Sequence, residues 1–207
     1  HSDGFRQWDG QKKCPKAPSI QTRAGGGMPP ARQSAEGREY MMERKQITAF
    51  LSEQLIQDKL TGNGKYWARE VCLDWGTKDV RRVDFMEFCP TGVLSVSEIE
   101  KGIFVSYEVK SCMADYKSGF GQNFVTEKNY LVMPMELYKK VVQDIEDSVG
   151  VICPVPEDRD VKEEFQSPTA LDTEGVKWRM RVVLPCLTGA RKRSMVELLF
   201  CMLRAGK

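Results

Sequence analysis

Three strand-like runs of apolar residues follow one another between residues 65 and 112, and they constrain the fold more than any other feature of the sequence. They are KYWAREVCLDW (65–75), VRRVDFMEF (80–88) and GIFVSYEVKSC (102–112). Segments that contain Gly, Pro, Thr and Asp, which are typical turn residues, separate these runs. Further runs of the same kind occupy residues 129–134, 149–156 and 178–186. The sequence therefore predicts a β-sheet to which the region 65–112 contributes three strands.

Segments with helical periodicity alternate with these runs and can cover the sheet. Apolar residues between 42 and 60 fall on one helical stripe, and residues 135–147 and 191–207 repeat this pattern. A short polar segment, residues 113–124, follows the third strand. The order of helix, three strands, short helix, strand, helix and strand predicts an α/β protein with a mixed central sheet flanked by helices.

Composition divides the chain into four stretches. Residues 1–40 are rich in Gly, Pro, Lys, Gln and Ser and lack a hydrophobic period, so we expect a flexible or disordered tail. Residues 41–156 form the expected core, and residues 157–175 are expected to be an acidic linker. Residues 176–207 are expected to add a last strand and a basic amphipathic helix to the same domain.

The formal net charge of +2 hides a strong asymmetry along the chain. Between residues 177 and 207 there are eight Lys and Arg residues against one Glu, whereas residues 136–174 contain eleven acidic residues against four basic ones. A basic C-terminal segment is compatible with binding a polyanion such as DNA. A solvated charged surface without a partner explains the same composition equally well.

Cysteine and histidine usage narrows the chemistry that is available. The seven cysteines are odd in number and scattered, no two form a C-x-x-C pair, and the single histidine is His1. We therefore expect free thiols and no zinc site, as is usual in a reducing cytoplasm. No apolar run approaches the roughly 18–20 residues that span a bilayer, so we expect a soluble, cytoplasmic protein without membrane partners. Any general acid or base must then be Asp, Glu, Lys or Tyr.

The run 102–112 carries two opposite charges, Glu108 and Lys110, near its end. Because side chains alternate along a strand, both project from the same face. The preceding run holds Asp84 between apolar neighbours, so Asp84 can lie beside Glu108 if the two runs pair. An acidic residue two positions before a lysine occurs four times in this chain, but only Glu108-Val109-Lys110 lies in a strand-like run.

Two neighbouring carboxylates in a sheet require a compensating charge. They repel each other, and burial of either one costs several kcal/mol. Mg²⁺ accepts carboxylate oxygens and keeps water and phosphate ligands, and Lys110 could then balance phosphate charge or orient an attacking water. Asp84, Glu108 and Lys110 therefore suit metal-assisted phosphodiester hydrolysis. The alternative is a structural ion pair between Glu108 and Lys110 with an exposed Asp84.

The same residues resemble a known family. Asp84, a turn, and then Glu108-Val109-Lys110 in the next strand resemble the motif of the PD-(D/E)XK nuclease superfamily. The run EVKSCMADYKSGFGQNFVTEKNYLVMPMELYKKV (108–141) is similar to a phage and bacterial branch related to MmcB-like DNA repair proteins. In that branch, a short helix and then an apolar strand that ends in proline follow the motif. The resemblance spans residues 66–156, and Val83 stands in place of the nominal proline.

This resemblance implies a restriction-endonuclease-like core and specific roles for the motif residues. Asp84 and Glu108 would ligate Mg²⁺ or Mn²⁺ together with the backbone carbonyl of Val109. Lys110 would act on the attacking water or on the charge of the transition state. An acidic residue of the first helix often assists in this superfamily, and Glu53 is the candidate here.

Other residues are candidates for contact with the substrate. The segment that follows the motif places Asp115, Tyr116 and Gln122 where the resemblance implies substrate contacts, and Gln122 is also a candidate assisting residue. Arg82 shares a strand face with Asp84, where it could contact a phosphate or pair with Glu70. The candidate DNA-binding residues are Arg82, Lys117, Arg191, Lys192 and Arg193.

Three functions follow from these features. The first is a metal-dependent deoxyribonuclease in phage or bacterial DNA processing or repair. The second is a DNA-binding module that keeps the nuclease fold without catalysis. The third is a partner-binding protein whose last helix docks on another subunit, which includes a homodimer.

Overall fold

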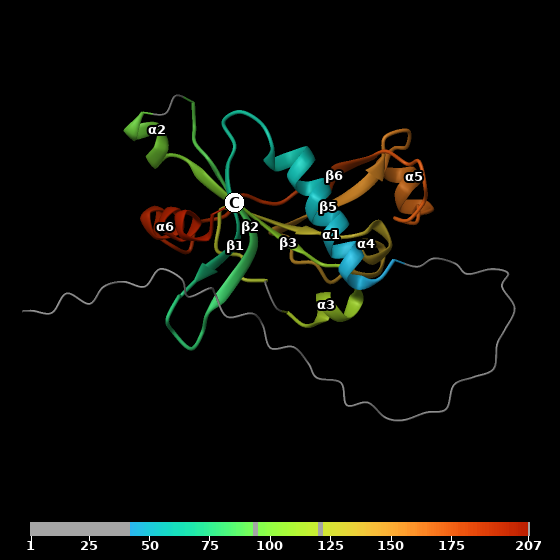
Figure 1. The fold of residues 1–207 in the computed structure, drawn as a ribbon, viewed down its shortest axis with the longest axis horizontal. Coiled ribbons are helices and arrows are strands. Elements are labelled where there is room, and N and C mark those ends of the chain that lie inside the picture. The colour runs from blue at the N-terminus through green and yellow to red at the C-terminus, as the bar shows by residue number, and fades with distance from the viewer. Residues whose placement is uncertain (1–41, 93–94, 120–121, 207) are drawn as a thin grey trace, which may run out of the picture. The chain divides into compact units, whose positions relative to one another are not determined.

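A six-stranded mixed sheet with helices on both faces forms the centre of the computed structural model, which describes residues 42–92, 95–119 and 122–206 (Figure 1). The strands are β1 (Tyr66–Leu73), β2 (Arg81–Cys89), β3 (Ile103–Val109), β4 (Lys128–Val132), β5 (Val149–Pro156) and β6 (Trp178–Leu184). The helices are α1 (Arg44–Leu55) with a π-helical continuation η1 (Ile56–Leu60), α2 (Val96–Glu100), α3 (Met113–Lys117), α4 (Met135–Val141), α5 (Val161–Gln166) and α6 (Met195–Ala205). The predicted α/β architecture is confirmed, and the predicted tail of residues 1–40 lies outside the described residues.

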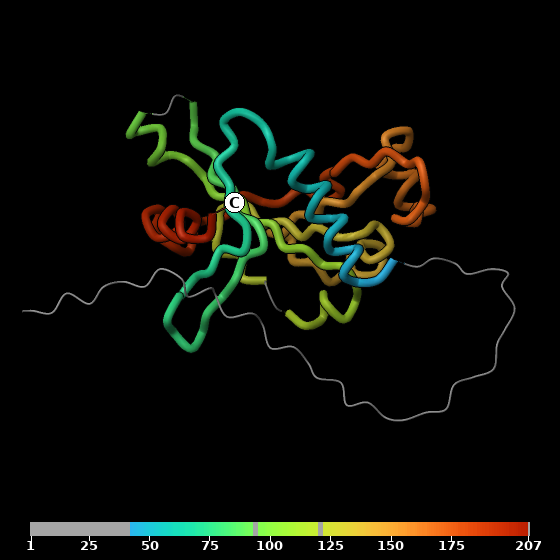
Figure 2. The backbone as a smooth tube through the Cα atoms, in the orientation of Figure 1, coloured from blue at the N-terminus to red at the C-terminus, as the bar shows by residue number. Residues whose placement is uncertain are grey.

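The strands are ordered along the sheet as they are along the chain, and the connections explain their directions. β2 runs antiparallel to both of its neighbours, β1 and β3, whereas β3, β4 and β5 are parallel, and β6 runs antiparallel to β5. Parallel neighbours need a crossover connection, which α3 supplies between β3 and β4 and α4 supplies between β4 and β5. Figure 2 follows this path from β1 to β6.

Each face of the sheet has its own hydrophobic layer. On one face, Leu51 and Leu55 of α1 pack with Tyr107 and Val109 of β3. On the other face, α6 packs against β1, β2 and β3, and α4 packs against β4 and β5. The alternation of side chains supports this assignment, because Val151 of β5 joins the α4 cluster while its neighbour in the strand joins the α1 cluster.

The segment 157–175 is a folded part of the domain, so the prediction of an acidic linker is wrong. It contains α5, whose Glu164 is 0% exposed. The Glu164 carboxylate lies 2.6 Å from the guanidinium group of Arg159 and accepts hydrogen bonds from the backbone N–H and hydroxyl of Thr169. Acidic residues of this segment therefore serve internal hydrogen bonds, which a charge count along the sequence does not reveal.

The sequence predicts free cysteine thiols and no membrane-spanning segment. Five described cysteines carry free thiols, namely Cys89, Cys112, Cys153, Cys186 and Cys201. Cys72 is not among these free thiols. In the described part of the chain, no helix has the length and apolar character needed to cross a membrane.

Candidate active site

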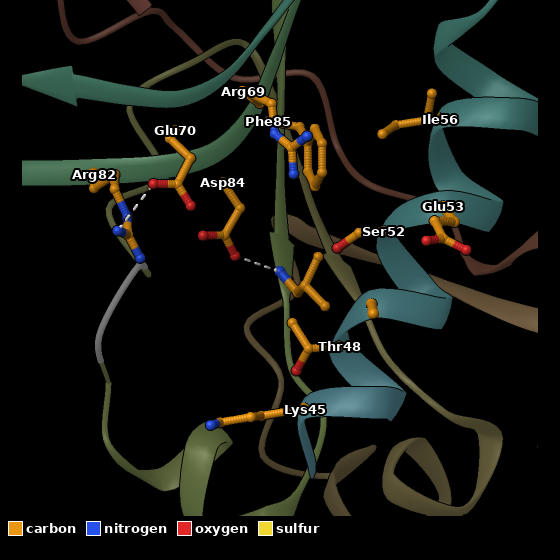
Figure 3. A pocket seen from close by; sticks show the side chains of 12 residues that line it. Lys45, Thr48, Ser52, Glu53, Ile56, Arg69, Glu70, Arg82, Asp84 and Phe85 are labelled. Carbon is orange, nitrogen blue, oxygen red and sulfur yellow. Dashed lines mark hydrogen bonds and ion pairs between the residues drawn. The ribbon is translucent and has the colours of Figure 1, made fainter. Parts of the chain in front are cut away.

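A pocket of about 410 Å³ lies between α1 and the strand pair β1–β2 (Figure 3). Polar and charged side chains of α1 form one wall, and residues of β1, β2 and the end of β3 form the other. The α1 wall includes Lys45, Thr48, Ser52 and Glu53, and the sheet wall consists of Arg69, Glu70, Arg82, Asp84, Phe85 and Val109.

Asp84 reaches this pocket because the alternation of side chains is interrupted in both β1 and β2, at the facing positions Glu70 and Asp84. Val83 and Met86 of β2 are three residues apart, yet both join the hydrophobic cluster beneath α6. Regular alternation would place them on opposite faces. Glu70 of β1 lies directly across from Asp84 and has a φ of 53°. The residues before and after Glu70 are paired with β2 in regular register. This local irregularity directs both carboxylates to the α1 side.

The carboxylate of Asp84 bridges β2 to β3. Its Oδ2 accepts a hydrogen bond of 2.9 Å from the backbone N–H of Val109. Burial raises the pKa of Asp84 above its ordinary value, while the Val109 hydrogen bond and the charges of Arg82 and Lys110 oppose this increase. Asp84 is therefore a partly desolvated acid that the end of β3 holds in place.

Glu108 and Lys110 are buried next to Asp84. Each is 3% exposed. Burial raises the pKa of Glu108 well above its ordinary value, the charge of Asp84 raises it further, and the charge of Lys110 and a hydrogen bond from the Asp84 backbone lower it. Val109 lines the pocket, whereas Glu108 and Lys110 on either side of it are not among the lining residues. The charges of Asp84 and Lys110 thus act on Glu108, whereas alternation along β3 directs the Glu108 side chain to the face of the sheet opposite to that of Val109.

Carboxylate groups such as those of Asp84 and Glu108 are the type of ligand that a hard divalent cation takes. Mg²⁺ is commonly held by one or two carboxylates and keeps several water or phosphate ligands. Among the described residues, no three Asp, Glu, Cys or His side chains group into a metal site, so Asp84 and Glu108 would be the side-chain ligands. A cation would relieve the repulsion that raises the pKa of Glu108. A role of the Val109 carbonyl as a third ligand stays a prediction.

Burial of these acids predicts that the metal-free protein becomes less stable as pH rises. Folding raises the pKa of Asp84 and of Glu108 above 3.8 and 4.5, so the folded protein binds more protons than the unfolded chain in the window above these values. The free energy of unfolding then falls with increasing pH until both groups have ionised in the folded state. Urea denaturation in EDTA from about pH 4 to about pH 9 measures this decline. We expect Glu108→Gln to flatten it, and an equally steep decline in this variant would contradict the assignment.

Within the pocket lining, Glu70 is the acidic neighbour of Asp84, and the assisting role of Glu53 stays a prediction. Glu53 is exposed and lines the pocket, but its side chain does not point toward Asp84 in Figure 3. The charge of Glu70 raises the pKa of Asp84, and the Glu70 carboxylate pairs with Arg82 at 3.1 Å. Of the two alternatives for Arg82, the structure shows the ion pair with Glu70.

The residues that follow the motif hold the local structure together. Asp115 accepts a hydrogen bond of 3.1 Å from the backbone N–H of Ser111 and forms an ion pair of 3.0 Å with Arg44. These contacts connect α3 to the first residue of α1. Gln122 donates a hydrogen bond of 3.2 Å to the backbone carbonyl of Tyr116. In the exposed last turn of α3, Lys117 is available to solvent.

Two of the three basic candidates before α6 form ion pairs within the protein. Arg191 pairs with Glu127 at 3.0 Å, and Arg193 pairs with Asp74 at 2.8 Å. Lys192 between them is exposed. None of the three lines the pocket, and α6 covers the face of the sheet opposite to α1. These two ion pairs therefore connect the segment before α6 to residues that adjoin β4 and β1.

Sequence reasoning missed the polar wall of α1. Lys45, Thr48 and Ser52 occupy positions i, i+3 and i+7 of the helix and therefore share one face. This spacing is visible in the sequence beside the apolar stripe of the same helix. Arg69 lies two residues after Trp67 of the α1 cluster and so faces α1 by regular alternation, but the sequence does not show which face of the sheet α1 covers.

Comparison with known proteins identifies no family. No family model matches the chain, and no curated protein matches it. Among solved structures, it is similar to the SPO1766 protein of unknown function from Silicibacter pomeroyi, with a TM-score of 0.47 and 15% sequence identity. The match covers 77% of this chain and 84% of that chain. The functional argument therefore rests on the geometry of the site.

Proposed function

We propose that this protein is a divalent-metal-dependent deoxyribonuclease that hydrolyses phosphodiester bonds of DNA. The observation that carries the proposal is the electrostatic coupling of the buried Glu108 to Asp84 and Lys110, with Asp84 lining a polar pocket. A structural ion pair between Glu108 and Lys110 needs no second carboxylate, yet the charge of Asp84 acts on Glu108. Clusters of mutually perturbed acids in a cleft are typical of catalytic sites.

Each residue has a distinct role in this proposal. Asp84 and Glu108 would hold the cation, which when bound polarises the phosphate and activates a water molecule. The charge of Lys110 lowers the pKa of both carboxylates, and Lys110 would orient that water or stabilise negative charge in the transition state. The hydrogen bond from Val109 to Asp84 holds the acid in a fixed position.

The resemblance to the PD-(D/E)XK superfamily supports the proposal at the same three residues. That superfamily uses an Asp of one strand and a Glu-x-Lys sequence of the next for metal-dependent cleavage of nucleic acids. In this chain, β2 carries Asp84, and its neighbour β3 carries Glu108 and is followed directly by Lys110. A place in phage or bacterial DNA processing or repair belongs to the same proposal.

Incubation of the purified protein with DNA tests the proposed activity. Linear duplex, nicked duplex and single-stranded DNA are each incubated with Mg²⁺ or Mn²⁺ and with an excess of EDTA. We expect cleavage of at least one of these forms with metal and none with EDTA. Absence of cleavage for all three forms with both metals would refute the proposal.

A DNA-binding protein without turnover is the second candidate. Both carboxylates accept hydrogen bonds from backbone N–H groups, Asp84 from Val109 and Glu108 from Asp84. These hydrogen bonds would join β2 to β3 even in a protein that performs no chemistry. Salt-dependent binding of DNA with no cleavage in the same assay would favour this second candidate.

A further inference from the structure

We propose that Lys45 and Arg69 form a binding site for the phosphate backbone of DNA, on the side of the pocket between α1 and β1. This inference rests on the proposed function, because the site would hold the part of the DNA backbone that lies next to the cleaved bond. Neither residue belongs to the PD-(D/E)XK motif, and neither is among the DNA-binding candidates that the sequence suggests.

The orientation of α1 is the first observation. Its apolar residues Leu51 and Leu55 are 0% exposed and anchor the helix on the sheet. The polar face with Lys45, Thr48 and Ser52 then lines the pocket, and Figure 3 shows these side chains on the side of the helix that faces Asp84. Hydroxyl and ammonium groups on one helix face are suitable donors for phosphate oxygens.

The position of Arg69 is the second observation. Its guanidinium group lies 5.9 Å from the centre of the Phe85 ring, and both side chains line the pocket. In Figure 3 the guanidinium group extends from β1 beside this ring, above Asp84. The ring limits the positions that the side chain can adopt, so less conformational freedom is lost when it binds a ligand.

The pairing of charges distinguishes Lys45 and Arg69 from Arg82. Arg82 is partly neutralised by its ion pair with Glu70. Among the described residues, Lys45 and Arg69 form no ion pair with an acidic side chain. Both are exposed, so a phosphate can contact them without first breaking an internal ion pair.

The charge balance of the pocket determines the conditions of the test. Its lining includes three cations and three anions, namely Lys45, Arg69, Arg82, Glu53, Glu70 and Asp84. A polyanion is therefore bound best when a divalent cation adds positive charge beside Asp84. Ca²⁺ commonly supplies this charge without supporting Mg²⁺-dependent chemistry, so it permits binding to be measured separately from cleavage.

Fluorescence anisotropy with a labelled DNA oligonucleotide in Ca²⁺ tests the inference. Lys45→Ala and Arg69→Ala are each expected to weaken binding about 3- to 10-fold at about 0.1 M salt, and to lower the slope of log Kd against log salt by about one. The matched controls are Lys78→Ala and Arg81→Ala, which replace exposed residues outside the pocket. They are expected to change neither quantity.

The outcomes separate this inference from the proposed function. If both pocket variants retain the affinity and the salt slope of the wild type, or if the wild-type protein binds no DNA, the inference is wrong. Cleavage by the wild type together with unchanged binding of the variants would overturn the inference and leave the nuclease proposal in place. The expected loss of binding without any cleavage by the wild type would support the phosphate site and refute the nuclease proposal.

Discussion

Asp84→Asn is expected to reduce metal-dependent DNA cleavage by at least about 10³-fold and to leave the fold intact. The variant removes a charged oxygen ligand, but the amide oxygen of Asn can still accept the hydrogen bond from the N–H of Val109. Loss of activity would then reflect the chemistry of the site and not unfolding. Cleavage rates under single-turnover conditions with Mg²⁺ measure the effect, and far-ultraviolet circular dichroism checks the fold.

Glu87→Gln is the matched control for this variant. Glu87 lies on β2 three residues after Asp84, is 3% exposed, and binds Lys65 and Tyr107 outside the pocket. We expect the control to keep its cleavage rate within a few-fold of the wild type, as an approximate limit. Equal losses of activity in Asp84→Asn and Glu87→Gln would show that any buried carboxylate of this strand matters and would contradict the assigned role of Asp84.

The largest expected effect on stability is at Glu164. Glu164→Ala removes a fully buried carboxylate that pairs with Arg159 and accepts two hydrogen bonds from Thr169. Removal of one member of a buried pair typically costs about 3–5 kcal/mol, and we expect about 3 kcal/mol because the Arg159 side chain is 29% exposed and water can reach it. Urea denaturation at neutral pH measures the change.

Asp158→Ala is the comparison variant for Glu164→Ala. Asp158 lies in the same segment, is exposed, and forms no ion pair within the described residues. Its replacement is expected to change the free energy of unfolding by less than about 0.5 kcal/mol. If Glu164→Ala is as stable as Asp158→Ala, the segment 157–175 contributes little to the folded domain, as the linker prediction would require.

The order of helices and strands was accessible from the sequence because apolar periodicity reports it directly. The proximity of Asp84 to Glu108 followed from one assumption, namely that neighbouring runs pair in the sheet, and β2 and β3 do pair. The side of the sheet that Asp84 reaches could not be predicted. It depends on the positive φ of Glu70, a conformation that few residues other than glycine adopt and that no residue pattern indicates here.

The distribution of charge along the sequence did not reveal which basic side chains form internal ion pairs. Arg191 and Arg193 contribute to a basic C-terminal segment, yet both are held in internal ion pairs with acidic residues distant in sequence. Net charge along a segment does not reveal such pairs, because their partners come together only in the fold. Arg69, by contrast, lies outside the basic segment and lines the pocket beside Asp84.

Binding of Mn²⁺ to the DNA-free protein, measured by electron paramagnetic resonance, tests most directly whether Asp84 and Glu108 bind one cation together. We expect a site in the wild type that Asp84→Asn and Glu108→Gln each weaken by at least about tenfold, because even the loss of an outer-shell partner costs 10–100-fold in metal affinity. The Glu87→Gln control is expected to bind as the wild type does. Affinity that is the same in the wild type and in both site variants would contradict a shared metal site.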